Sequence, residues 1–462
     1  MNFGRPNDVA RGRPICSLIP ENIVRVLERF MIKHFWLAFA LLLTLPGVAA
    51  RAQMLPPDQT LLPFTRYMAV RERMIVGFDT PGVRVGSFTL RPTLDVTGNY
   101  NDNAFALQNP RIGAGYVAIT PAAQLQSNWS NRSLALDASA EIDRFLTHTS
   151  ENTETVNTSA YGTQQLGSNT LVRAIVRYNE QRESRESENS FSLTERPVRY
   201  EQETGAFGLS HRFARVLISG NAGVTRSHFF DARRLVSGLT PSPLDPLFGQ
   251  QYRNNDNFEL KLRTEVAQSQ ALSYFAQITR DATSYDRDPK FGFGRESKNY
   301  EVLGGLRFEL PVLARGEIGI GYQDSSYRGA QFSKSSGLAV NSTIMFFPTQ
   351  LLTVTVDVRR AANNSGLTNA NSYVQLSGGV HVDYELLRTL ILGAGVQLER
   401  DTFNGVDRRD GRVGFNGTVD WRLTPRLWLR GAYDRLDLSS NGIARYNSFV
   451  RNRFTLGIGV RL

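Results

Sequence analysis

The sequence has almost no cysteine, because Cys16 is the only thiol among its 462 residues. Cys16 lies in a segment that we expect to be removed on export, so the mature chain would have no disulfide and no thiolate chemistry. Histidine is nearly as sparse. The five histidines are scattered along the chain, and no pair has the close spacing of a zinc motif. We therefore expect no metal and no cofactor.

Long apolar runs are also missing, with one exception at residues 35–45, which read FWLAFALLLTL. This run is too short to span a bilayer as a helix, but it suits the core of a secretory signal. Basic residues precede it, and the small-x-small sequence at 50–52 follows it. We expect a signal segment over 1–52, in which the extension before Met31 is superfluous for export, and a mature chain that starts at Gln53.

Lysine is scarce after the expected signal, so the positive charge of the mature chain is almost entirely arginine. The formal net charge is +10 for the whole chain. Guanidinium groups favour bidentate contacts with carboxylates, phosphates and sugar-bound acids. We interpret the arginines as groups that face a channel lumen or lipopolysaccharide, and we expect no nucleic-acid partner.

What the chain does contain, from about residue 84 onward, is an alternation of apolar and polar residues with period two, the pattern of β-strands. The last segment shows it best. One face carries Phe454, Leu456, Ile458, Val460 and Leu462, and the other carries Arg453, Thr455, Gly457, Gly459 and Arg461. The alternation is long enough for a tilted strand to cross a membrane, with one face toward lipid and the other toward water.

The connections between these segments alternate between tight turns and longer polar links, which is typical of outer-membrane barrels. The pattern predicts about eighteen strands, with sixteen as the alternative count. An even number returns both ends of the chain to the periplasm and leaves the long links extracellular. Because lipid tolerates no unpaired strand edge, the strand near 85–100 is expected to pair with 446–462.

The predicted fold is therefore all-β: an antiparallel up-and-down transmembrane β-barrel of the outer membrane, over residues 84–462. The stretch 53–83 lacks the alternation and contains four prolines, at 56, 57, 63 and 81. We expect it to be a periplasmic segment, too short to form a globular plug. The expected partners are outer-membrane lipid, lipopolysaccharide and, through the strand 452–462, the barrel-assembly machinery.

The start of the first expected strand reads GVRVGSFTLRPTLD from Gly82, and NYNDNAF follows from Asn99. These residues resemble the opening of the Putative beta-barrel porin 2 family, in which Gly-x-Arg-x-Gly-Ser-Phe leads to Tyr-Asp-Asp-Asn-x-Phe. Thr93 replaces the more usual serine, and Asn101 stands where aspartate is commoner. The resemblance covers about 25 residues and implies an outer-membrane barrel. Some members are similar to barrels encoded with exopolysaccharide export genes, and the family offers no catalytic residue.

The face expected to point inward carries both signs of charge in comparable number. One interpretation is that these charges pair and stiffen the wall; the other is a wet channel for a polar solute such as an oligosaccharide. The candidate lumen-facing residues are Lys261, Arg263, Glu265, Arg307, Glu309, Arg359, Asp383, Arg412, Asp420, Arg422, Arg430 and Asp434.

The leading functional hypothesis is a porin-type channel for polar solutes, with export of a surface or extracellular polysaccharide as its more specific form. The alternative is a non-conducting barrel whose links 181–197 and 229–251 bind surface polymer or other partners. The link 229–251 is the longest and least polar, and we expect it either to fold into the lumen or to cap it, and so to set the constriction. No enzyme is expected: His148 and His228 have serine and aspartate nearby, but those residue types occur in every polar link here.

Overall fold

The computed structural model describes only part of the chain, namely residues 68–73, 75, 77–78, 82–189, 194–235, 246–286, 295–310, 313–329, 332–367, 370 and 372–462. The expected signal segment and residues 53–67 lie outside the described residues. Contacts divide the chain into Met1–Pro46 and Gly47–Leu462, and every described residue belongs to the second unit. No helix among the described residues is long and apolar enough to cross a membrane.

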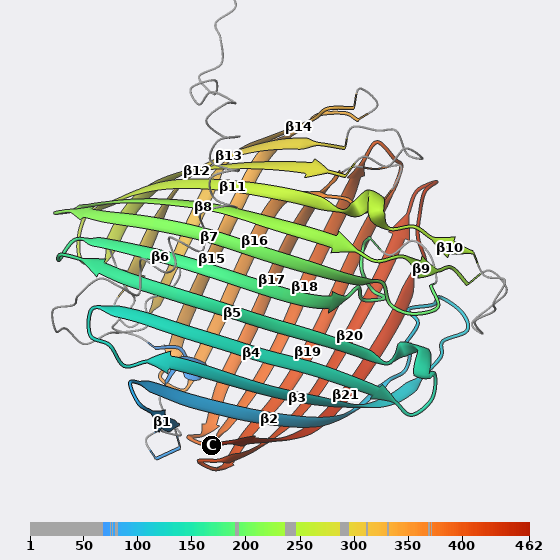
Figure 1. The fold of residues 1–462 in the computed structure, drawn as a ribbon, viewed down its shortest axis with the longest axis horizontal. Coiled ribbons are helices and arrows are strands. Elements are labelled where there is room, and N and C mark those ends of the chain that lie inside the picture. The colour runs from blue at the N-terminus through green and yellow to red at the C-terminus, as the bar shows by residue number, and fades with distance from the viewer. Residues whose placement is uncertain are drawn as a thin grey trace, which may run out of the picture. The chain divides into compact units, whose positions relative to one another are not determined.

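Eighteen antiparallel strands of 13 to 16 residues form the wall of this unit (Figure 1). They are β2 (Phe88–Asn101), β3 (Ala114–Ser127), β4 (Arg132–Phe145), β5 (Thr153–Leu166), β6 (Thr170–Arg182), β7 (Arg199–Phe213), β8 (Val216–Phe229), β11 (Asn255–Ala267), β12 (Leu272–Tyr285), β13 (Ser297–Leu310), β14 (Ala314–Tyr327), β15 (Ser335–Thr349), β16 (Leu352–Asn364), β17 (Ser372–Leu387), β18 (Leu390–Asn404), β19 (Arg409–Thr424), β20 (Leu427–Asn441) and β21 (Phe449–Arg461). The short elements are β1 (Val83–Val85), β9 (Ala232–Arg233), β10 (Leu247–Phe248) and the 3-10 turns η2 (Val70–Glu72), η3 (Thr149–Glu151) and η4 (Gln251–Arg253).

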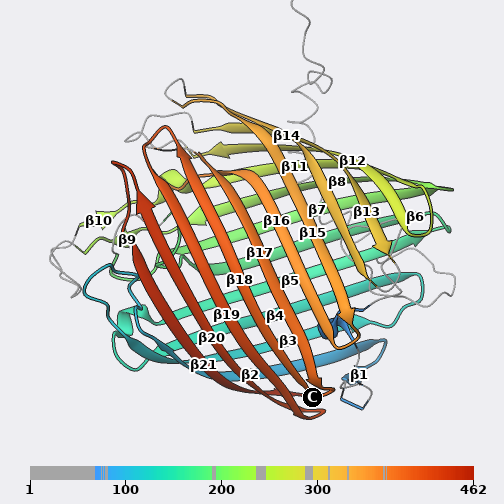
Figure 2. The ribbon, with the colours of Figure 1, turned by 180° about the vertical axis from the view of Figure 1, so that it is seen from behind.

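The wall closes on itself, because the first long strand pairs with the last. Strand β2 is hydrogen-bonded to β21 in a register that runs from Thr93 opposite Arg461 to Asn101 opposite Arg453. Figures 1 and 2 show the blue β2 beside the red β21 from opposite sides. The predicted barrel, its eighteen strands and its closing pair are thus confirmed.

The two ends of the barrel differ in the length of their connections. At one end, the turns that join β3 to β4, β5 to β6 and so on to β19 and β20 have two to four residues. We call this the short-turn end. At the other end, the connections have four to 25 residues, and the longest is 230–254 between β8 and β11. We call this the long-link end. The predicted alternation of tight turns and longer links is confirmed.

The burial pattern is the reverse of that in a soluble protein. Large apolar side chains such as Leu262, Val302 and Leu456 are 47 to 72% exposed, whereas Glu265 and Asp401 are 0 to 1% exposed. Apolar groups therefore cover the outside of the wall and charged groups fill the inside. This arrangement suits a barrel that is surrounded by lipid and polar within.

An arginine on the outer face should therefore be costly. We expect Leu456→Arg to lower the free energy of unfolding by about 2–4 kcal/mol, because this 72% exposed position on β21 faces the hydrocarbon. Ile443→Arg is the matched control, since Ile443 is 94% exposed but lies in the link between β20 and β21. Urea unfolding of the protein in lipid vesicles measures both. An equal cost for the two substitutions would contradict a lipid-facing Leu456.

Candidate functional site

The inner wall carries charged side chains that pair between strands. Arg263 on β11 makes two hydrogen bonds, of 2.9 and 2.8 Å, to the carboxylate of Glu317 on β14. Arg307 on β13 reaches the same carboxylate at 3.4 Å. Glu265 accepts a hydrogen bond of 2.7 Å from the hydroxyl of Ser273. Bidentate pairs of this kind hold the wall rigid and keep the interior polar.

The candidate lumen residues fall into four places along the wall. The first place is on β11 and β13, with Arg263, Glu265, Arg307 and the buried Glu309, and the second is around Glu301, which interacts electrostatically with Lys261 and Arg359. The third place is near the short-turn end, with Asp383, Asp420, Arg422 and Arg430. The fourth is toward the long-link end, where Arg412 pairs with Glu188 and Asp434 pairs with Arg451. The structure brings the third group together around one further residue, Arg71, which was not among the candidates.

The link between β6 and β7 sends a segment across the interior of the barrel. We call residues 183–189 the crossing segment. In a ring of eighteen strands, β17 is the ninth strand from β6 in either direction, and it therefore lies on the opposite wall. The carboxylate of Glu188 accepts a hydrogen bond of 2.9 Å from the Tyr373 hydroxyl on β17. The crossing segment thus reaches the far side of the lumen.

Two ionic anchors hold the crossing segment on β21 and β19, which are the fifth and seventh strands from β6 around the ring. The carboxylate of Glu186 accepts two hydrogen bonds, of 2.8 and 2.7 Å, from the guanidinium of Arg451 on β21. The Glu188 carboxylate lies 3.3 Å from a terminal nitrogen of Arg412 on β19. The arginine side chains are only 5% and 11% exposed. Ion pairs so well shielded from water are screened little by salt.

The near side of the crossing segment is held in the same way. Arg185 donates to both oxygens of Glu151, in the link between β4 and β5, at 3.1 and 2.7 Å. Glu183 accepts 2.6 and 3.0 Å hydrogen bonds from Arg253 in η4. Breaking a buried pair by removing one partner is strongly destabilising. Four ionic anchors therefore fix the segment in one position across the lumen.

Sequence reasoning placed the constriction in 229–251, and it did not find the crossing segment. Residues 236–245 of that link lie outside the described residues. The observed link, 230–254, contributes through η4, because Tyr252 donates a 3.1 Å hydrogen bond to the carbonyl of Gly366 in the link after β16. Burial raises the pKa of Tyr252 to about 12, so its hydroxyl remains a donor at neutral pH. In the sequence, the glutamates at 183, 186 and 188 were the signal that could have indicated a segment anchored by ion pairs.

A second group of interior contacts lies at the short-turn end, where residues 68–73 meet the wall. Arg71 donates hydrogen bonds of 2.6 Å to Asp383 on β17 and to Asp420 on β19. Glu72 accepts 2.6 Å hydrogen bonds from Arg315 on β14. Burial alone would lower the pKa of Arg71, but the hydrogen bonds from Arg71 to the two aspartates raise it overall. This short segment thus bridges three strands inside the barrel.

Proteolysis can test whether the ion pair between Glu72 and Arg315 anchors residues 68–73. A charge-assisted hydrogen bond contributes about 1.5–3 kcal/mol, and the exposure of Glu72 places this one near the lower value. We expect Glu72→Gln to speed trypsin cleavage after Arg71 or Arg73 by about tenfold. Glu154→Gln is the control, because Glu154 pairs with Arg144 on the wall and not with this segment. Equal cleavage rates in both variants and the parent would refute the anchor.

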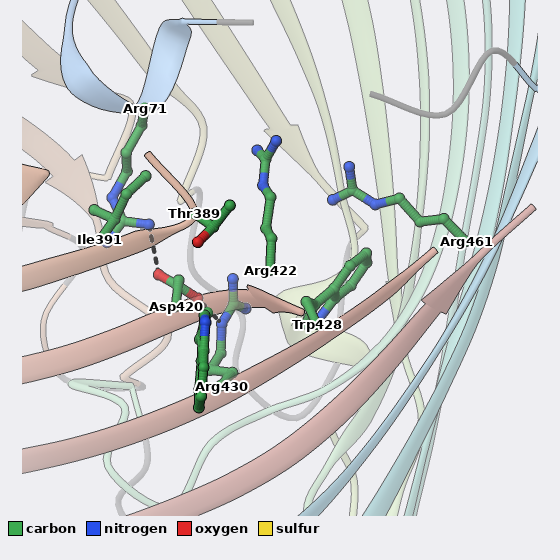
Figure 3. A pocket seen from close by; sticks show the side chains of 9 residues that line it. Arg71, Thr389, Ile391, Asp420, Arg422, Trp428, Arg430 and Arg461 are labelled. Atoms are coloured by element: carbon green, nitrogen blue, oxygen red, sulfur yellow. Dashed lines mark hydrogen bonds and ion pairs between the residues drawn. The ribbon is translucent and has the colours of Figure 1, made fainter. Parts of the chain in front are cut away.

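A cavity of about 120 Å³ opens beside Arg71 (Figure 3). Arg71 points down to Asp420 in the figure, while Arg422 and Arg461 project into the open space. The Arg461 guanidinium lies 4.1 Å from the ring centre of Trp428. The lining includes more arginines than carboxylates, namely Arg71, Arg422, Arg430 and Arg461 against Asp420.

The two histidines weighed as catalytic bases lie against aromatic rings. His148 packs edge-on against Phe105 at 5.3 Å between ring centres, and His228 packs against Phe230 at 4.8 Å. Among the residues that the structure describes, no group of three His, Cys, Asp or Glu side chains could hold a metal ion.

Comparison with known proteins gives one family and several distant likenesses. The family model described as Putative beta-barrel porin 2 matches residues 76–462. No curated protein matches the chain. Among solved structures, the siderophore receptor PirA from Acinetobacter baumannii is similar at 7% identity with a TM-score of 0.42, covering 80% of each chain. The outer membrane protein opdK from Pseudomonas aeruginosa is 10% identical with a TM-score of 0.42, covering 81% of this chain and 99% of its own. OpdL from Pseudomonas aeruginosa is 12% identical with a TM-score of 0.42, covering 82% and 100%.

Proposed function

The chain belongs to the Putative beta-barrel porin 2 family, and on that premise we propose that it is an outer-membrane channel for polar solutes. The long-link end faces outward in this proposal, and the short-turn end, with the start of β2 and the end of β21, faces the periplasm. Outer-membrane lipid and lipopolysaccharide surround it, and strand 452–462 is the segment offered to the barrel-assembly machinery.

The observation that carries the proposal is the charged interior of a wide barrel. Barrels of sixteen to eighteen strands leave room for an aqueous channel. Here the cavity beside Arg71 has an excess of arginine, which supports passage of an anionic or hydroxyl-rich solute.

The more specific form of the proposal is export of a surface or extracellular polysaccharide. Guanidinium groups match the acid groups of sugars, and aromatic rings such as Trp428 offer flat surfaces beside them. These groups occur at the short-turn end, where a polymer from the periplasm would enter. The proposed solute is therefore a polar chain that enters by the cavity beside Arg71.

The second candidate, a non-conducting barrel that binds surface polymer by its outer links, is favoured by a different observation. The crossing segment is fixed by four ionic anchors, and residues 68–73 are fixed at the other end. A lumen obstructed at both ends would pass nothing. Under this alternative the links 181–197 and 229–251 would contact the polymer.

Swelling of liposomes distinguishes the two candidates. Vesicles that contain the protein are diluted into isotonic solutions of neutral sugars of increasing size. A channel gives swelling rates that fall with sugar size, whereas a blocked barrel gives the rate of protein-free vesicles at every size. Swelling absent even with the smallest sugar would overturn the channel.

A further inference from the structure

Arg295, in the link just before β13, is a buried cation with no ionic partner in the part of the chain that the structure describes. Its residue is 6% exposed. One terminal nitrogen donates to the carbonyl of Ser365, and the guanidinium lies 5.0 Å from the ring centre of Tyr285 and 5.5 Å from that of Tyr252. Within the described ranges no carboxylate pairs with it, and its Nη1 is buried without a hydrogen-bond partner.

Burial lowers the pKa of Arg295, and the nearby charge of Arg253 lowers it further. Arginine nevertheless stays protonated in proteins, so the positive charge persists. A buried charge that lacks a partner is costly to the folded state. Arg253 does not share this condition, because Glu183 pairs with it at 2.6 Å. Of these two neighbouring arginines, Arg295 is the one without a carboxylate partner among the described residues.

Arg295 lines a cavity of about 150 Å³ between the crossing segment and the wall at the long-link end. At about 30 Å³ for each water in the liquid, this is room for roughly five waters, or for an acid group and part of one sugar ring. The other side chains that matter here are amides and rings, namely Asn189, Asn255, Asn257, Asn364, Phe229 and Tyr285. Arg253 also lines the cavity, but Glu183 pairs with it, so Arg295 is the lining arginine without a carboxylate partner among the described residues.

Three of these asparagines are already fixed by hydrogen bonds to a wall strand or to the link after β16. Asn257 and Asn364 both donate to the hydroxyl of Thr283, at 2.9 and 3.0 Å, and Asn189 accepts from the Gly366 amide at 2.7 Å. Each amide has two donor hydrogens and an acceptor oxygen, so each keeps capacity for a ligand. Fixed amides bind hydroxyl groups without a further loss of rotamer freedom, and a guanidinium binds a carboxylate in a fixed geometry.

We propose that this cavity binds the carboxylate of an acidic sugar, a uronic acid unit of a saccharide, with Arg295 as its ionic partner and the asparagines on its hydroxyl groups. The proposal deepens the proposed function and rests on it only for how the saccharide arrives. The site would hold one unit of a polar chain beside the crossing segment. Neutral sugars lack the group that Arg295 needs, so the cavity selects by charge.

Calorimetric titration of the full mature chain in detergent with trigalacturonic acid tests the site directly. We expect saturable binding of trigalacturonic acid. Maltotriose, which lacks the carboxylate, and sodium acetate, which lacks the sugar hydroxyl groups, should each bind at least about tenfold more weakly. Arg295→Gln should weaken trigalacturonate binding by at least about tenfold. The control, Arg328→Gln, should leave it unchanged, because the Arg328 side chain is 65% exposed and pairs with Glu296 at the same end of the barrel.

A second variant guards against misfolding of the first. Asn364→Asp keeps the shape of the side chain and supplies a carboxylate beside Arg295, so it should weaken the binding of trigalacturonate by at least about tenfold while the protein keeps the heat-dependent gel mobility of the parent. Equal affinity for acidic and neutral trimers, or undiminished affinity in both variants, would overturn the proposal. Since binding in detergent requires no ion flow, a protein that binds but does not conduct would refute the channel and leave the site standing.

Discussion

Replacing residues 184–189 with glycine and serine is expected to raise the single-channel conductance at least about twofold, because an eighteen-strand lumen is wide enough for water once nothing crosses it. The replacement keeps the length of the link between β6 and β7 but removes Arg185, Glu186 and Glu188, whose ion pairs hold the segment across the interior. Planar-bilayer recording in KCl measures the step size.

The control for this replacement is the same change at residues 442–445, a link at the same end in which Ile443 is 94% exposed. It should leave the step size unchanged. If the conductance of the 184–189 variant equals that of the parent, another part of the chain sets the narrowest point, and the link 229–251 becomes the segment to delete.

The second large effect is expected on ion selectivity. The double variant Arg422→Glu, Arg461→Glu changes the charge of the short-turn cavity by four units, and the lining of that cavity now includes four arginines and one aspartate. Charged side chains that line a pore set the sign of the ions it passes. We expect the reversal potential in a KCl gradient to change sign, from anion preference in the parent to cation preference in the variant.

The matched control makes the same charge change on the outer face. Arg400 and Arg435 lie two residues along their strands from the exposed Leu398 and Tyr433, so they point to the same outer face. The double variant Arg400→Glu, Arg435→Glu should therefore leave the reversal potential at the parent value. A parent protein without anion preference, or a double variant of Arg422 and Arg461 that keeps this preference, would show that the arginines around Arg71 do not set the selectivity of the conduction path.

The parts of the fold that could be predicted from sequence depend on local patterns. Alternation with period two identifies both faces of a strand, and turn residues mark where each strand ends. Closure of β2 on β21 followed from physics, because an open sheet edge cannot persist in lipid. These rules need no knowledge of distant contacts, and they led to the correct strand count and closing pair.

The interior could not be predicted in the same way. The crossing segment is polar like every other long link, and its anchors are far away in sequence: Glu186 and Arg451 are 265 residues apart. Arg71 and Asp420 are 349 residues apart. Nothing in the local pattern of either partner indicates the other. Charged positions on strands could be assigned to the inward face, but which of them meet was decided by the tilt and shear of the closed barrel.

The central claim is that the closed wall surrounds a lumen that conducts. The measurement that tests it most directly is single-channel recording of residues 53–462, refolded and shown by heat-dependent gel mobility to be a folded barrel. The account predicts discrete, stable current steps with a preference for anions. A folded barrel that inserts into the bilayer and gives no steps would contradict it.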